Sequence, residues 1–216
     1  MDDLLTEGEQ WEAVKAWARR NGVAVVAGLA IGALGLFGWR WWEARNERIA
    51  LEAGTKYMDI LETYDRGEIL TATNLVDELK KAHPATAYVG PAELAAARMF
   101  VTTNELDKAA DRLRNVMDTS KDEQLKLVAR LRLARVQTSQ GKSDDAIKTL
   151  GTLPEGSAFA ARYAEARGDA LLAKGDRDGA LKEFLVARGA ESFAPANGVA
   201  GANQLELKIN DLKAGS

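Results

Sequence analysis

The sequence predicts an all-α protein with one N-terminal transmembrane helix, followed by an α-solenoid of about four helical hairpins and a C-terminal capping helix. Three observations lead to this prediction. They are an uncharged stretch over residues 21–39, ten-residue strings that recur every 34 to 37 residues, and only 4 prolines in 216 residues. The high alanine and leucine content also favours helices. We expect an N-terminal segment over 1–20, a transmembrane anchor over 21–42 and one repeat domain over 43–216.

The N-terminal segment begins with acidic residues and continues as an amphipathic stretch. Trp11, Val14 and Trp17 share one face of a helix that leads toward the uncharged stretch. This pattern is typical of a helix that approaches a membrane surface. A solvated tail with incidental aromatic residues is the alternative.

The uncharged stretch is long enough to cross a bilayer once, because 19 residues at about 1.5 Å per residue span roughly 30 Å. Aromatic and basic residues flank it on both sides, as at membrane interfaces: Trp17, Arg19, Arg20, Trp39, Arg40, Trp41 and Trp42. A cleaved signal peptide would have a shorter apolar core followed by small residues. A buried soluble helix is the other alternative. We expect an uncleaved anchor, whose orientation the nearly balanced flanking charges leave open.

Small residues recur on one face of the expected anchor, at Ala24, Gly28, Gly32 and Gly35. This spacing allows a second transmembrane helix to approach backbone to backbone. Glycine is also frequent in membrane helices in general. The face is therefore a candidate contact with another transmembrane helix.

Three ten-residue strings, 104–113, 141–150 and 175–184, align without gaps and predict a repeat. Each begins with Gly or Asn and has Asp at the fourth position, Ala at the sixth and a large apolar residue at the tenth. A weaker copy begins at Gly67 and has Leu70 in place of the Asp. Gly or Asn can end a helix in the left-handed conformation, Asp can cap or favour the next helix start, and Ala permits close packing.

A small residue lies seven positions before three of the four turns, at Ala97, Ala134 and Gly168, whereas Ile60 occupies this position in the first copy. This pattern resembles the tetratricopeptide repeat, in which helical hairpins stack and their first helices line a concave groove. Such a groove implies binding. Residues 196–213 are expected to form the capping helix, with three apolar residues at helical spacing: Leu205, Ile209 and Leu212.

Positions on the inner face of the first helices are candidates for partner binding. They are Tyr57, Tyr64, Leu94, Arg98, Leu131, Arg132, Arg135, Thr138, Asp169 and Leu172, with Leu61, Val101 and Glu165 on the same face. The three arginines could hold a carboxylate through charge-assisted hydrogen bonds. Solvated arginines paired within their own helix are the alternative. The two tyrosines are equally consistent with ordinary packing.

The sequence contains no pattern typical of an enzyme. It has no cysteine, one histidine (His83), and no HExxH, GxSxG or P-loop spacing. The string GDRDG at 175–179 lacks the later glutamate of a calcium loop. A net charge of −3 provides no basic surface for nucleic acid. We expect no catalytic site, metal or cofactor, and no nucleic-acid partner.

The chain resembles the YfgM-type ancillary subunits of the bacterial SecYEG translocon over its whole length. Five strings carry the resemblance: QWEAVKAWARRNG before the anchor, GWRWWEA at its exit, NELDKAA at 104–110, LRLARVQ at 131–137 and RGDALLAKGDRDGA at 167–180. Neither the histidine nor the groove positions belong to a family motif. No functional residue is therefore carried over.

The resemblance implies a single-pass protein of the bacterial inner membrane, with residues 1–20 cytoplasmic and residues 43–216 periplasmic. Its implied partners are the lipid bilayer, the SecYEG translocon, a membrane-anchored periplasmic chaperone of the prolyl-isomerase type, and exported client proteins. The implied role is to help pass exported proteins to periplasmic chaperones through protein–protein binding. The alternative is a membrane-anchored repeat scaffold for an envelope complex or regulator, without client handling.

Overall fold

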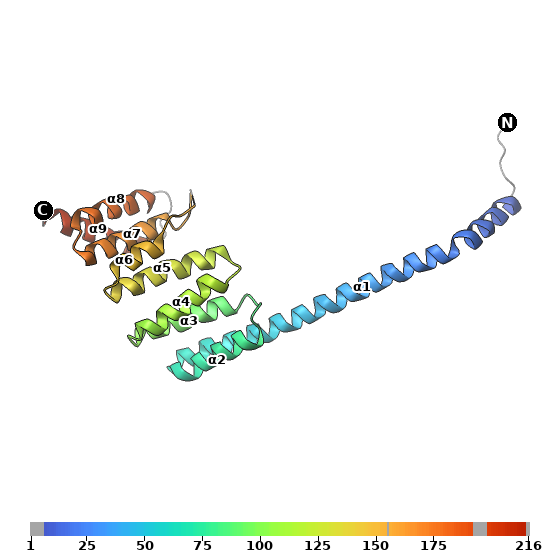
Figure 1. Cartoon of the computed structure of the whole chain (residues 1–216), viewed down its shortest axis with the longest axis horizontal. Coiled ribbons are helices and arrows are strands. Elements are labelled where there is room, and N and C mark those ends of the chain that lie inside the picture. Colours follow the sequence, from blue (N-terminus) through green and yellow to red (C-terminus); the bar gives the residue numbers. More distant parts are fainter. Residues whose placement is uncertain (1–6, 155, 192–197, 215–216) are drawn as a thin grey trace, which may run out of the picture. The chain divides into compact units, whose positions relative to one another are not determined.

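The computed structural model of the protein describes residues 7–154, 156–191 and 198–214, which form helices and turns with no strand among them (Figure 1). The predicted all-α class is confirmed. Residues 1–6 of the predicted N-terminal segment and residues 196–197 of the predicted capping stretch lie outside the described residues. The chain divides into two compact units, Met1–Glu52 and Ala53–Ser216.

The first unit consists of the N-terminal part of α1 (Glu7–Asp65), a continuous helix that includes the predicted boundaries at residues 20 and 42. Its apolar side chains are exposed along the predicted anchor, and Val23 has an exposed fraction of 86%. An 18-residue window of this helix reaches a mean hydropathy of 2.0. Among the described helices, α1 is thus the one that is long and apolar enough to cross a membrane.

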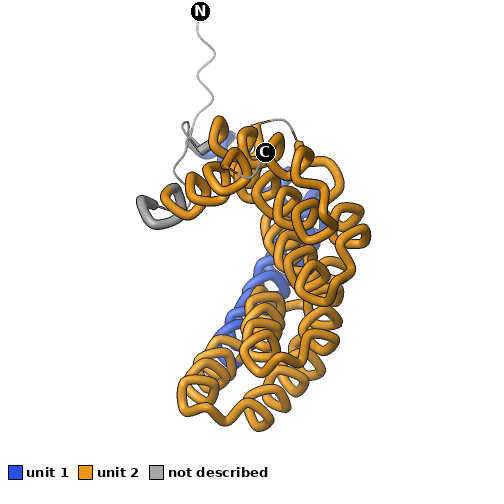
Figure 2. Tube along the Cα trace, turned by 90° about the vertical axis from the view of Figure 1, so that its left-hand side faces the viewer, with its two compact units in different colours: residues 1–52 blue, residues 53–216 orange. Residues whose placement is uncertain are grey.

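Within its described residues the second unit contains the end of α1 and eight further helices, and Figure 2 shows its trace following an arc. The helices are α2 (Ile69–Ala82), α3 (Val89–Thr102), α4 (Leu106–Thr119), α5 (Glu123–Ser139), α6 (Ser143–Leu150), α7 (Ala160–Lys174), α8 (Arg177–Glu191) and α9 (Gly198–Ala214). From α2 to α9 each helix packs on the next, and α5 also contacts α3 and α7. These contacts between first helices of successive hairpins are those of a solenoid.

All four predicted turns are confirmed by backbone geometry. Gly67, Asn104, Gly141 and Gly175 have φ values of 77°, 61°, 75° and 92°. L-residues other than asparagine rarely adopt this left-handed conformation, which explains why only Gly and Asn occur at these positions. The weaker first copy is thus a genuine hairpin, formed by the end of α1 and by α2.

The residues seven positions before and nine positions after each turn have complementary sizes, and both are buried. The four pairs are Ile60 with Val76, Ala97 with Leu113, Ala134 with Leu150, and Gly168 with Phe184. The last pair is in direct contact, because a Cβ on Gly168 would lie 2.5 Å from Phe184 Cε1. The exceptional isoleucine of the first copy is paired with valine, the smallest of the four residues at the second position.

Two of the three recurring aspartates, Asp107 and Asp144, link hairpins and do not cap helices, in contrast to one of their predicted roles. Asp107 lies in the first turn of α4, where the helix dipole favours a carboxylate, and no side chain caps that helix. Its Oδ1 accepts a hydrogen bond of 2.8 Å from Gln140 Nε2. Asp144 similarly accepts from Lys174 Nζ at 2.6 Å. Each contact joins a second helix to the end of the next hairpin's first helix.

The apolar core forms three successive clusters along the solenoid. The first joins the end of α1 to α5, the second joins α5 to α7, and the third joins α7 to α9. Leu205, Ile209 and Leu212 of α9 are buried in the third cluster against Phe184. The described part of the predicted capping helix therefore covers the apolar face of the last hairpin.

Candidate protein-binding groove

The inner faces of α1, α3 and α5 enclose a cavity of about 570 Å³ within the second unit. Six of the residues predicted on the groove face line it: Tyr57, Leu61, Tyr64, Leu94, Arg98 and Arg132. Asp65, Pro91, Ala95, Met99 and Thr102 complete the wall. The repeat pattern therefore brings together residues that are separated by up to two hairpins in the sequence.

A second cavity of about 230 Å³ lies between α3 and α5, with α4 contributing to its wall. It is lined by Ala97, Arg98, Val101, Leu106, Leu113, Arg132, Arg135, Val136 and Ser139. Apart from the arginines and the serine, this lining is apolar. Arg98 and Arg132 border both cavities and thus lie where the two meet.

The groove arginines are largely without counter-charges. Among the described residues, neither Arg98 nor Arg132 has a carboxylate oxygen within 4 Å, so pairing within their own helices is not observed. Arg135 reaches across to Glu165 on α7, with 3.7 Å between Nη2 and Oε2. Burial lowers the pKa of Arg132, and the charges of Arg98 and Arg135 lower it further. Arg98 and Arg132 therefore place positive charge in the groove without a direct carboxylate partner among the described residues.

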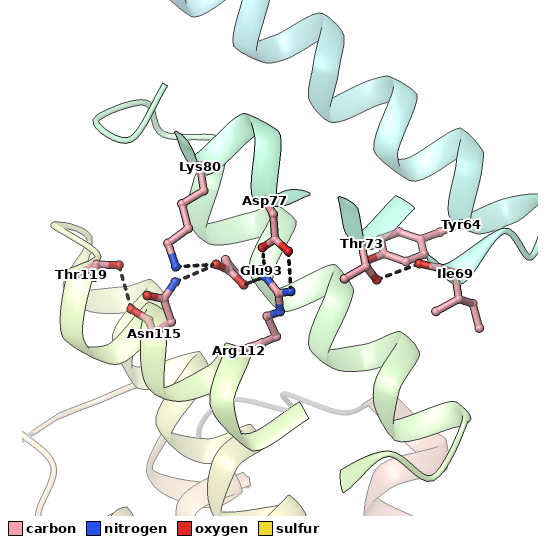
Figure 3. A network of polar contacts seen from close by, with 9 residues as sticks. All are labelled: Tyr64, Ile69, Thr73, Asp77, Lys80, Glu93, Arg112, Asn115 and Thr119. Carbon is pink, nitrogen blue, oxygen red and sulfur yellow. Dashed lines mark hydrogen bonds and ion pairs between the residues drawn. The ribbon is translucent and has the colours of Figure 1, made fainter. Parts of the chain in front are cut away.

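The two tyrosines of the larger cavity are held by packing. The ring of Tyr57 lies 5.8 Å from that of Tyr88, which in turn covers Gly54 on α1. The hydroxyl of Tyr64 lies 3.4 Å from Thr73 Oγ1, and this threonine donates to the carbonyl of Ile69 (Figure 3). Both tyrosines thus contribute to the core and to the groove wall. The two interpretations of the sequence, ordinary packing and a place on the groove face, are therefore compatible.

Two predicted groove residues on α5 have mainly structural contacts. Leu131 is buried in the second core cluster, together with Leu150 and Tyr163. Thr138 is half-buried and donates a hydrogen bond of 3.0 Å to the carbonyl of Ala134. Neither residue lines the two cavities described above.

The acidic end of the predicted groove is neutralised by α9. Lys208 Nζ lies 2.9 Å from Glu165 Oε1 and 2.7 Å from Asp169 Oδ1. Burial raises the pKa of Asp169, although the hydrogen bond and charge of Lys208 act in the opposite direction. Leu172 packs against the third core cluster, to which α9 contributes. The capping helix thus covers the predicted groove residues of α7. The arginine-lined cavities formed by α1, α3 and α5 remain open.

A buried carboxylate that we did not predict from the sequence joins the first two hairpins (Figure 3). Glu93 on α3 has an exposed fraction of 0% and accepts hydrogen bonds from Asn115 at 2.7 Å and from Arg112 at 3.2 Å. Lys80 Nζ on α2 lies 3.3 Å away. Arg112 also binds both oxygens of Asp77 on α2. The network therefore ties α2, α3 and α4 together.

A sequence signal for this network existed. Glu93 precedes Ala96, Ala97 and Phe100 by three, four and seven positions, so it lies on an apolar helical stripe. A carboxylate on such a stripe must be paired when it is buried. The partners could not be identified in the same way, because they come from other helices.

His83 and the GDRDG string, the candidates for catalysis or metal binding in the sequence, lie at helix ends. His83 follows α2, and its backbone N–H donates to the Leu79 carbonyl. Asp176 of the GDRDG string accepts a hydrogen bond of 2.9 Å from the backbone of Gly179 and so caps α8. Within residues 7–154, 156–191 and 198–214, no group of three His, Cys, Asp or Glu side chains could hold a metal ion.

Comparison with known proteins shows similarity along nearly the whole chain. A profile of the tetratricopeptide repeat-like domain family matches residues 15–214. A protein of Escherichia coli K12 named "Ancillary SecYEG translocon subunit" is 36% identical over 98% of this chain and 99% of its own length. A protein of the same name from Haemophilus influenzae is 29% identical over 85% of this chain and 89% of its own length.

Solved structures are similar in fold at low sequence identity. The structure titled MamA 41-end from Desulfovibrio magneticus RS-1 has a TM-score of 0.53 and 12% identity, and covers 76% of this chain and 96% of that one. A MamA RS-1 double mutant gives the same TM-score at 11% identity, covering 76% and 95% of the two chains. At this identity the likeness concerns the helical-repeat fold alone.

Proposed function

The chain belongs to the family of ancillary SecYEG translocon subunits, and from this premise we propose that it is a non-enzymatic, membrane-anchored adaptor of that translocon. Its task would be to help pass exported proteins to periplasmic chaperones through protein–protein binding. The observation that carries the proposal is the arginine-lined groove formed by stacked first helices. A concave solenoid surface of this kind is suited to binding another polypeptide.

The proposed location is the bacterial inner membrane, with residues 1–20 in the cytoplasm, residues 21–42 as the anchor and residues 43–216 in the periplasm. The exposed apolar length of α1 supports an anchor. The family supports the orientation, and the basic residues that follow the span do not oppose it, because large domains are translocated largely regardless of nearby charge. The absence of cysteine is compatible with an oxidising compartment.

The proposed partners are the SecYEG translocon, a membrane-anchored periplasmic chaperone of the prolyl-isomerase type, and exported clients. The names of the relatives support the first of these. The groove supports binding of a polypeptide segment without identifying its source. We therefore propose that the anchor keeps the repeat domain beside the export site, so that its groove meets exported proteins at high local concentration.

Site-specific photocrosslinking tests the proposal. A photoreactive amino acid is introduced at Leu61 or Val101, which line the two cavities, and crosslinking is triggered while an exported protein is held partway through the translocon. We expect the arrested protein to be captured from both groove positions. A probe at Val186, an exposed residue of α8, serves as the control. Capture of only a chaperone or regulator would favour the scaffold function over client handling.

The face formed by Ala24, Gly28, Gly32 and Gly35 is proposed as the contact with a transmembrane helix of the assembly. Each of the four residues has at most a methyl side chain, so a neighbouring helix could approach this face closely.

Paired substitutions test this contact. Replacing both Gly28 and Gly32 with Leu should reduce co-purification of the translocon. The matched control replaces both Ala30 and Ala33 with Leu. These two alanines lie on the opposite face of the helix, because successive helical residues are rotated by about 100°. Equal co-purification of the two variants would exclude a specific contact on the glycine face.

A further inference from the structure

We propose that the groove binds an extended protein segment in which one carboxylate side chain lies between two apolar side chains on the same face of the segment. The inference rests on the proposed function, because it specifies the chemistry of the segment that the adaptor would take. Its basis is the order of features along the groove. An aromatic-walled cavity, two unpaired arginines and a smaller apolar cavity follow one another.

The arginines lie where the two cavities meet, so the carboxylate of the bound segment is expected between its two apolar side chains. Arg98 and Arg132 line both cavities, so a segment that fills both lies against these two arginines. Guanidinium donates to carboxylate oxygens in a planar fork and forms bidentate, charge-assisted hydrogen bonds. A carboxylate at this point would also relieve the mutual repulsion of the arginines.

The two cavities explain the flanking apolar side chains. The smaller one is lined by Val101, Leu106 and Val136, which offer no polar atom except their backbones. The larger one has Leu61 and Leu94 beside its tyrosines. Apolar side chains gain most free energy on leaving water for such surfaces. In an extended segment they share a face with the carboxylate when they lie two positions before and after it.

The charges around the groove favour an acidic segment over a basic one. Asp65 lines the larger cavity but is exposed and forms no ion pair within 4 Å among the described residues. Glu165 and Asp169 are already neutralised by Lys208 and Arg135. A basic segment would therefore meet unpaired arginines, and its binding would leave like charges desolvated side by side.

The test uses the full chain in lipid nanodiscs and fluorescence anisotropy with synthetic peptides. The probe contains Leu-Ser-Glu-Ser-Phe within a Gly/Ser peptide that carries an uncharged fluorophore on its N-terminus and an amide at its C-terminus, so that its only charge is the glutamate. One control peptide has Lys in place of Glu, and another has Ser in place of Leu and Phe. We expect the probe to bind at least about 10-fold more tightly than either control.

Substitutions in the protein locate the binding. Arg98→Gln combined with Arg132→Gln should weaken binding of the probe about 10-fold or more. The control Arg114→Gln removes an arginine that pairs with Asp111 on α4, and should leave binding unchanged within about twofold. Arg98→Glu combined with Arg132→Glu should reverse the preference in favour of the lysine peptide. Thermal melts followed by circular dichroism verify that each variant is folded.

Several outcomes would overturn the inference. They are equal binding of the acidic and basic peptides, binding unaffected by the groove substitutions, no binding of the probe at millimolar concentration, or self-association of the full chain that the groove substitutions abolish. The last would identify a second copy as the occupant. Co-purification of the translocon separates this inference from the proposed function. If the wild-type chain co-purifies but binds no acidic peptide, only the inference fails, whereas absent co-purification refutes the proposed function itself.

Discussion

The packing of Gly168 against Phe184 predicts that alanine is destabilising at a helical position where it would normally be favourable. A Cβ at residue 168 would lie 2.5 Å from Cε1 and 2.6 Å from Cδ1 of Phe184, whereas carbon atoms pack at about 3.5–4.0 Å. The phenylalanine has an exposed fraction of 0% and lies in the same core cluster as Ile209 and Leu205 of α9, so its ring is held away from solvent. The overlap of about 1 Å must therefore be absorbed by the core.

The expected magnitude follows from two opposing effects. Overpacking costs about 1–3 kcal/mol, whereas replacing a helical glycine with alanine contributes up to about 1 kcal/mol. Gly168→Ala should therefore lower the free energy of unfolding by about 1 kcal/mol, which corresponds to about 2–4 °C in Tm. Phe184→Leu alone should cost about 1–2 kcal/mol because it leaves a void beside the glycine.

The double variant is the decisive measurement, because it recreates the Ala–Leu pairs that the second and third hairpins have at these positions. We expect it to be more stable than the sum of the single changes predicts, with a coupling energy of at least about 1 kcal/mol. Denaturation of the full chain in detergent, followed by circular dichroism at 222 nm, provides the values. Gly189→Ala is the matched control, since a Cβ at that position of α8 has no atom within 4 Å.

Two results would refute this reasoning. The first is a Gly168→Ala variant that melts at or above the wild type, which would mean that the helical preference of alanine is unopposed. The second is additivity of the two changes in the double variant, which would mean that the side chains do not compete for one volume.

Three further predictions concern stability. Arg112→Met should lower the free energy of unfolding by about 3 kcal/mol, because it deprives the buried glutamate of α3 of a charged partner, whereas Arg114→Met on the surface should change it by less than about 0.5 kcal/mol; urea denaturation distinguishes the two. The hydrogen bond from Arg112 lowers the pKa of Asp77, so the ionised Asp77 stabilises the fold above its unfolded-state pKa and this stabilisation is lost as the pH falls through its folded-state pKa. Asp77→Asn should therefore make the decrease of Tm below about pH 4 shallower. A Tm profile identical to that of the wild type would contradict this. Gly141→Ala should cost about 1 kcal/mol because of its φ of 75°, whereas Asn104→Gly, at a φ of 61°, should change thermal stability little; equal effects would argue against backbone strain.

The hairpins and their turns could be predicted because their signals are local. A few consecutive positions are enough to show a left-handed residue at each turn, the small residues Ala109 and Ala146, and apolar residues at helical spacing. The same is true of the candidate transmembrane stretch, whose apolar length can be recognised from consecutive residues alone. The inner positions of α3 also follow from this periodicity, and Arg98 lines the groove as expected.

Contacts between hairpins could not be predicted, because they depend on how neighbouring helices are aligned. The aspartate at position 107 indicated a helix start, but its partner is Gln140 at the end of α5. Asp169 has the sequence position of an open groove residue, yet Lys208 of the capping helix neutralises it. Leu131 is also predicted to face the groove, but it is buried in the same core cluster as Tyr163 and Leu150.

The sequence by itself determined the all-α class, the apolar helix that is long enough to cross a membrane, and the four hairpins with their turns, because periodicity and backbone preference act over one or two helical turns. Only the tertiary structure decided which groove residues remain open, which charges are neutralised and how Glu93 is paired. The physical reason is that burial and charge pairing depend on side chains from different hairpins. Their distances are set by the stacking of the solenoid and not by spacing along the chain.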